Sequence, residues 1–125
     1  MRIDRDPLVP GPLIEGFATG GFRIEGSIQP ALLLTPESAM PWDPPALAQL
    51  TEADLATLIA ANPEFILLGT GATLVRPPLA LRKAFDARRL GLEAMDSRAA
   101  ARAWGILRAE GRRVTAALYP LDHRA

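Results

Sequence analysis

A short apolar run that stops at two glycines constrains the fold of this 125-residue chain more than any other feature. Residues Phe65 to Gly69 carry no polar side chain, follow Pro63 and lead into Thr70 and Gly71. Such a run is too short for an independent helix, whereas a strand that is covered on both faces has this length and composition. The run therefore predicts a buried strand in the middle of a sheet.

Helices and strands alternate in the second half of the chain. The apolar spacing predicts helices over residues 51–61, 79–90 and about 98–109. Short apolar segments at residues 92–95 and 113–119 are expected to be strands. Together with the first apolar run, these segments give the order strand, helix, strand, helix, strand from residue 65 onward. That order predicts right-handed βαβ units and a mostly parallel sheet.

Residues that favour helix ends flank the predicted helices. Thr51 is expected to cap the first helix through its hydroxyl, with Asp54 at the positive helix end. Gly91 is expected to cap the carboxyl end of the second helix. Asp96 and Ser97 precede the third helix and are predicted to cap its amino end.

The first half of the chain predicts a β-hairpin and one further strand. Alternating residues at 14–18 and 22–24 flank a Gly-Gly turn, and residues 31–35 form an apolar segment that Pro36 ends. Residues 36–49 contain four prolines and are expected to be a surface loop, with Trp42 packed onto the core.

These elements predict a single α/β domain over residues 14–125, after an irregular, proline-containing arm at residues 1–13. We expect a mixed central sheet with helices packed on it and an N-terminal β-hairpin layer. Hydrophobic residues make up 49% of the chain, which is enough for a substantial core.

Composition excludes several classes of site. The chain has no cysteine, so disulfides, thiolate metal sites and cysteine nucleophiles are excluded, and His123 is the only histidine. We expect no metal and no cofactor. No apolar run approaches the ~20 residues that span a membrane, and the N-terminus lacks the apolar core of a secretory signal. A cytoplasmic protein without a membrane span is expected.

Charge is unevenly distributed although the net charge is zero. Residues 1–64 hold nine acidic and three basic side chains, a net charge of −6, and residues 65–125 hold five acidic and eleven basic ones, a net charge of +6. Two interpretations stay open. The halves complement each other within one fold, or the second half presents a basic face to an acidic partner. The few aromatic residues do not alternate with arginines, so no nucleic acid partner is expected.

Two predicted strand ends are expected to meet at one edge of the sheet. Residues 69–71 follow one strand and residues 95–97 follow the next, and parallel strands end at the same edge. A glycine loop of this kind either forms a tight turn or directs backbone N–H groups at an anion. Arginines on the following helices are expected within reach. The candidate site for a ligand or partner comprises Gly69, Thr70, Gly71, Arg82, Asp96, Ser97 and Arg102.

Six short segments keep their order and spacing along almost the whole chain from about residue 14. They are residues 20–24, 42–43, 66–71, 81–82, 93–97 and 109–114. Together they resemble a family of small proteins, mostly uncharacterised bacterial ones, that includes mitochondrial complex I assembly factor 3. The resemblance implies a single α/β domain with helices on one side of a mixed sheet and extra strands on the other. It also implies an assembly factor that binds partner proteins without turnover. The family's cysteine and tyrosine-asparagine pair are replaced here by Ala101, Trp104 and Gly105.

Three functions follow as hypotheses. The first is a non-enzymatic protein-binding or assembly domain of the bacterial cytoplasm, either monomeric or homodimeric. The second is a small-molecule site at the Gly69 loop that takes an anionic ligand. The third is an enzyme that uses Asp96, although the sequence contains no complete catalytic set.

Overall fold

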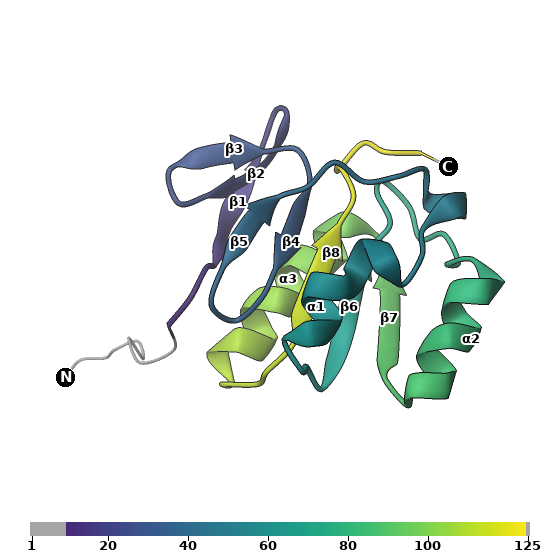
Figure 1. Ribbon diagram of the computed structural model, residues 1–125. Coiled ribbons are helices and arrows are strands. Elements are labelled where there is room, and N and C mark those ends of the chain that lie inside the picture. Colours follow the sequence, from purple (N-terminus) through teal and green to yellow (C-terminus); the bar gives the residue numbers. More distant parts are fainter. Residues whose placement is uncertain (1–9, 125) are drawn as a thin grey trace.

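The computed structural model describes residues 10–124 and confirms a mixed α/β fold with two sheets (Figure 1). The smaller sheet is antiparallel and has the strand order β1-β2-β3. Its strands are β1 (Ile14–Ala18), β2 (Gly21–Ile24) and β3 (Ser27–Gln29). The first two strands form the predicted hairpin, and they form a layer beside the larger sheet.

The larger sheet has the strand order β5-β4-β8-β6-β7. The central strand β6 pairs in parallel with β7 and β8, and β4 pairs antiparallel with β8 and β5. The apolar run at residues 65–69 therefore has a strand on each side, as predicted. The strand bounds are β4 (Leu32–Leu34), β5 (Ala39–Pro41), β6 (Phe65–Gly69), β7 (Gly91–Met95) and β8 (Thr115–Leu118).

Within the described residues, three α-helices and two short 3-10 helices join these strands. The α-helices are α1 (Ala56–Ala60), α2 (Leu79–Arg88) and α3 (Ser97–Ala109). The 3-10 helices are η1 (Leu47–Gln49) and η2 (Ala53–Leu55). None of the helices in the described part of the chain combines the length and apolarity that a membrane crossing requires.

Helices cover both faces of the larger sheet, whereas the family resemblance implied helices on one face only. The chain moves from β6 outward to β7 through α2, and then returns past β6 to β8 through α3. Right-handed connections that run in opposite directions place their helices on opposite faces of a sheet. Figure 1 accordingly shows α3 behind the sheet and α1 in front of it.

The core is divided by the larger sheet into two clusters. On one face, Leu67 packs with Trp104 of α3 and with Phe22 of the smaller sheet. On the other face, Ile66 and Leu68 pack with side chains of α1 and α2, including Phe85. Because β6 contributes to both clusters, its residues 66–69 are buried and Phe65 is partly buried, which explains why the strand lacks polar side chains.

Two of the predicted helix caps are wrong. The Thr51 hydroxyl does not cap the helix, because it donates to the Asp54 carboxylate (3.0 Å) and the chain continues as η2 before α1. Gly91 is the first residue of β7, and Arg89 ends α2 in the left-handed conformation instead. The third cap is confirmed for Asp96, whose carboxylate accepts from the Ala99 N–H (2.9 Å). Ser97 does not cap the helix, because it is the first residue of α3 and its hydroxyl bonds to Gly71 and Tyr119.

The proline-containing segment at residues 36–49 is more regular than predicted. It contains β5, which pairs with β4, and the 3-10 helix η1. The ring of Trp42 packs edge-on against Tyr119 at a centroid distance of 5.1 Å. Trp42 is thus attached to the core as expected, although the segment is not a simple loop. The third strand of the smaller sheet, β3, was not predicted either.

Oppositely charged residues from the two halves of the chain pair with each other. Among residues 10–124, three ion pairs join a first-half glutamate to a second-half arginine: Glu37 with Arg113, Glu52 with Arg88, and Glu64 with Arg112. These pairs lie at the surface, where water screens the charges and each pair contributes little to stability. They favour the interpretation that the halves complement each other within one fold.

The segment at residues 10–13 lies against α3. The indole N–H of Trp104 donates to the Pro12 carbonyl (3.0 Å), and the Arg108 guanidinium donates to the Pro10 carbonyl (3.3 Å). This part of the predicted arm is therefore fastened to the domain. Residues 1–9 of that arm lie outside the described residues, and the domain boundary at residue 14 remains a prediction.

Candidate functional site

The two predicted strand ends lie side by side. Gly69 of β6 is opposite Met95 of β7, and the Thr70 N–H donates to the Met95 carbonyl (2.8 Å). Beyond them, the Ser97 N–H donates to the Gly71 carbonyl (2.8 Å). We call residues 69–71 and 95–97 the carboxyl rim. It lies where α2 and α3 leave the sheet toward opposite faces, which is where open α/β sheets usually bind ligands.

The Ser97 hydroxyl joins three segments at the carboxyl rim and is buried, so a ligand does not reach it. It donates to the Tyr119 carbonyl (2.7 Å) and accepts from the Gly71 N–H (2.8 Å), and the residue is fully buried. The N–H groups of Thr70 and Gly71, which we considered as anion donors, are thus both occupied within the protein.

The side chains of Thr70 and Asp96 also serve the local structure. The buried Thr70 hydroxyl donates to the Thr73 carbonyl (2.6 Å) and accepts from the Val75 N–H (3.0 Å), which shapes the loop after β6. The Asp96 carboxylate caps α3. Neither residue lines the pockets that border residues 18–21, 59–64, 82–92 or 50–52.

The C-terminal segment covers the carboxyl rim. The Ala72 N–H donates to the His123 carbonyl (2.9 Å), and a Cβ atom at Gly71 would collide with that same carbonyl. Gly71 also has a φ angle of +106°, which favours glycine. At Gly69, a Cβ atom would lie 2.9 Å from the Ser97 Cα. Figure 1 shows the C-terminal segment in yellow running over this edge of the sheet.

Contacts of Tyr119 and the His123 ring hold the C-terminal segment in place over the carboxyl rim. The Tyr119 hydroxyl donates to the Pro45 carbonyl (2.9 Å), and its ring lies 5.1 Å from the His123 ring. Burial raises the pKa of the Tyr119 hydroxyl well above its ordinary value, and the negative charge of Asp54 adds to this effect. Tyr119 is therefore a neutral structural group.

Two arginines of the predicted site lie away from the carboxyl rim. The Arg82 side chain donates to the Pro77 carbonyl (3.1 Å) and borders a small pocket together with Gly91 and Leu92, at the start of β7. The Arg102 guanidinium lies 5.8 Å from the centre of the Phe17 ring, beside the smaller sheet. The structure thus brings together the five rim residues of the predicted site and separates the two arginines from them.

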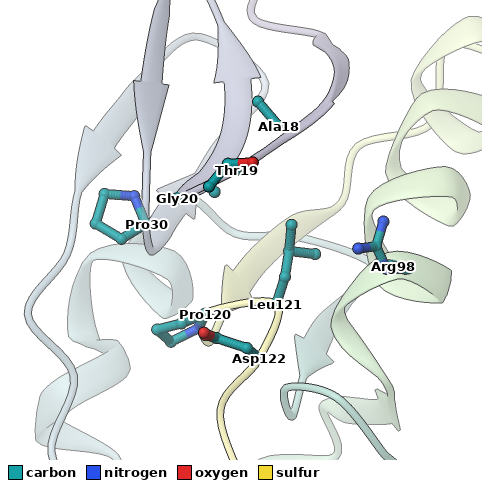
Figure 2. A pocket seen from close by; sticks show the side chains of 9 residues that line it. Ala18, Thr19, Gly20, Pro30, Arg98, Pro120, Leu121 and Asp122 are labelled. Atoms are coloured by element: carbon teal, nitrogen blue, oxygen red, sulfur yellow. The ribbon is translucent and has the colours of Figure 1, made fainter.

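An open pocket of ≈ 460 Å³ lies next to the rim, between the β1–β2 turn and the segment that follows β8. We call it the hairpin pocket. Figure 2 shows Leu121 pointing toward the turn and Arg98 reaching in from α3. Its lining consists of Ala18, Thr19, Gly20, Gly21, Pro30, Arg98, Pro120, Leu121 and Asp122.

Sequence reasoning missed the hairpin pocket as a site, although two of its components were visible. The Gly20-Gly21 turn belongs to the segments that carry the family resemblance, and Arg98 follows the predicted cap of α3. The third component, residues 120–122, has no periodic pattern. Only the fold shows that this segment turns back beside the hairpin.

Metal binding has no support from the arrangement of side chains. Within residues 10–124, no three histidine, cysteine, aspartate or glutamate side chains gather as a metal site requires.

Proteins of similar sequence align with most of this chain. Residues 14–119 match a family described as protein of unknown function (DUF498/DUF598). An uncharacterized protein of Rhodobacter capsulatus is 37% identical, with 94% of this chain and 92% of that protein covered.

Two solved bacterial structures have the same fold. The crystal structure of a Bordetella parapertussis protein has a TM-score of 0.80 and 32% identity, over 91% of this chain and 99% of that one. The solution structure of a Bordetella pertussis protein is described as a Mth938-like domain. It has a TM-score of 0.79 and 28% identity, over 98% of this chain and 94% of that one.

Proposed function

This chain belongs to the DUF498/DUF598 family of proteins of unknown function, and we propose that it is a non-catalytic domain that binds a protein partner. The observation that supports this proposal most is the contrast between the carboxyl rim and the hairpin pocket. Reactive side chains at the rim are engaged within the protein, whereas the pocket is open and holds no nucleophile paired with a base.

The composition of the hairpin pocket suits binding. Its walls combine apolar surface, such as Leu121 and Pro30, with the exposed charges of Arg98 and Asp122. Apolar surface beside a few charged groups is typical of a site that binds part of another protein. Thr19 and Asp122 line the same pocket, but among the described residues the Thr19 hydroxyl forms no hydrogen bond with a base that would activate it.

We further propose a role as an assembly factor in the cytoplasm. This part of the proposal rests on the resemblance of the sequence to the family that includes mitochondrial complex I assembly factor 3. The partner would then be a subunit or precursor of a larger complex that the domain holds during assembly. A monomer or a homodimer would serve this role equally.

Site-specific photo-crosslinking in the native host tests the proposal. A benzophenone amino acid would replace Thr19, which is exposed at the hairpin pocket, or Lys83, which is exposed on α2 away from the pocket. We expect a discrete adduct with one protein from position 19 and no such adduct from position 83. The same adducts from both positions, or none from position 19, would contradict a partner at the pocket.

A further inference from the structure

Two arginines of α3 share one aromatic ring next to the hairpin pocket. The guanidinium carbon of Arg98 lies 4.8 Å from the centre of the Phe17 ring, and that of Arg102 lies 5.8 Å from it. The two residues are one helical turn apart, so both reach the same part of β1. Phe17 is held in turn by an edge-on contact with the buried Phe22, at 6.3 Å.

Stacking prepares these guanidinium groups for a carboxylate. A guanidinium that lies over an aromatic ring keeps its N–H groups free at its edge, and the ring limits the conformations that it must lose on binding. Among the described residues, neither arginine forms an ion pair with a carboxylate of this protein. Arg88, Arg112 and Arg113 differ in this respect, because each forms an ion pair with a glutamate of this protein.

Apolar surface continues from Arg98 into the pocket. Leu121 projects toward the β1–β2 turn, and Pro30 and Pro120 border the same space (Figure 2). Asp122 lies on the other side of Leu121 from Arg98, as Figure 2 shows. Its negative charge disfavours a carboxylate deep in the pocket. A ligand would therefore place an apolar side chain inside and its carboxylates outside, against the arginines.

We infer that the hairpin pocket recognises an acidic peptide segment of the protein partner, with one apolar side chain in the pocket and flanking carboxylates on Arg98 and Arg102. The inference rests on the proposed function and adds the chemistry of the partner. It assigns to Phe17 a positioning role, because this ring orders the two guanidinium groups without contacting the peptide.

Binding of a short fluorescein-labelled peptide of alternating glutamate and leucine, followed by fluorescence anisotropy, tests this chemistry. We expect the wild-type chain to bind this peptide and to prefer it over matched peptides in which glutamine or lysine replaces glutamate. The double variant Arg98→Glu/Arg102→Glu should bind roughly tenfold or more weakly. Lys83→Glu, which makes the same change of charge per substitution at one exposed site on α2, should bind like the wild type. Added salt should weaken the binding, because these charges are exposed.

The conservative variants separate charge from stacking. Arg98→Lys keeps the charge but loses the planar fork, and Phe17→Leu removes the ring, so each should weaken binding by a few-fold. Equal binding of the glutamate and glutamine peptides would overturn the inference. Inorganic phosphate that competes as well as the peptide would also overturn it, because it would indicate a bare anion site.

Crosslinking from position 19 distinguishes failure of this inference from failure of the proposed function. If the adduct forms and persists in the Arg98→Glu/Arg102→Glu background, a partner binds but not through these arginines. If no adduct forms in the wild type, the proposed function itself fails. Loss of the adduct in the double variant alone, with a normal circular dichroism spectrum, is the result that we expect.

Discussion

The carboxyl rim and the hairpin pocket are neighbours, share the C-terminal segment, and differ in what that segment does. At the rim, His123 covers the glycine loop and Ser97 ties together three parts of the chain. At the pocket, residues 120–122 of the same segment form one wall of an open space. A sheet edge that usually binds ligands is thus closed by the protein's own chain, and the adjacent surface stays open.

This contrast shows that residue types alone do not identify a site. The rim gathers a threonine, an aspartate, a serine and two glycines, which are common in active sites, yet each has a structural partner. The pocket has fewer such residues but leaves its arginine exposed. Substitutions at the rim should therefore affect folding, and substitutions at the pocket should affect binding.

The largest expected effect is on the cover over the rim. Gly71→Ala places a methyl group against the His123 carbonyl at a φ angle that disfavours alanine. We expect the free energy of unfolding, measured with urea, to fall by about 3 kcal/mol. Gly26→Ala is the matched control, since Gly26 also has a positive φ angle but faces open space, and should lose only about 1–2 kcal/mol. Equal losses of stability in the two variants would mean that the C-terminal segment is not packed tightly against Gly71.

A smaller loss is expected at the junction of the three segments. Ser97→Ala leaves the Gly71 N–H and the Tyr119 carbonyl without their buried partner, which should cost about 2 kcal/mol in urea unfolding. Ser27→Ala, at an exposed serine with one long hydrogen bond of 3.3 Å, should change stability by less than about 0.5 kcal/mol. If Ser97→Ala is as mild as its control, the hydroxyl does not hold the rim together.

Acidic solution should weaken the ion pairs between the two halves of the chain. These pairs lie outside both the carboxyl rim and the hairpin pocket. Hydrogen bonds from Arg113 and Arg112 hold the pKa values of Glu37 and Glu64 below their ordinary value of 4.5. A lowered pKa in the folded state stabilises the protein above the unfolded pKa, and this contribution is lost as the pH falls through the folded pKa. Thermal unfolding should therefore occur at lower temperature as the solution becomes acidic.

The variant Glu37→Gln/Glu64→Gln checks the origin of that pH dependence. This variant should be less stable than the wild type at neutral pH, and its unfolding temperature should depend less on pH on the acidic side. Peptide binding at the hairpin pocket should be unchanged. An unchanged profile would assign the acid sensitivity to other carboxylates.

The smallest effect on stability is expected at the pocket itself. Arg98→Ala removes an exposed side chain whose contact within the described residues is the face of Phe17. The free energy of unfolding should change by no more than about 0.5 kcal/mol. A loss comparable to that of Ser97→Ala would make Arg98 a structural residue and would remove the contrast between the two regions.

The sequence predicts the parts of the fold that depend on local pattern. The apolar run at residues 65–69 identifies the central strand, and Asp96 identifies the start of α3, because burial and capping each leave a local signature. Such patterns do not give strand order. That β8 lies beside β6, and that α2 and α3 therefore cover opposite faces, depends on contacts between distant residues.

Whether the candidate site is open or covered depends even more on contacts between residues that are far apart in the sequence. From the sequence, an anion site and a tight turn both stayed open at the rim, because nothing in residues 120–123 indicates that this segment folds back over Gly71. For the same reason sequence reasoning placed Arg102 near the rim, whereas the fold turns this side chain toward Phe17. β5 was missed because prolines surround it, and its pairing with β4 overrides that local signal.

A nuclear magnetic resonance titration tests the central claim most directly. The wild-type chain would be labelled with ¹⁵N and titrated with the glutamate-leucine peptide while every backbone amide is followed. We predict that the largest shift changes cluster at residues 17–21, 98, 102 and 121–122, and that the amides of Gly71 and Ser97 change little. Changes centred on residues 69–71 and 97 would contradict the account, because they would show that the closed rim is the site that binds.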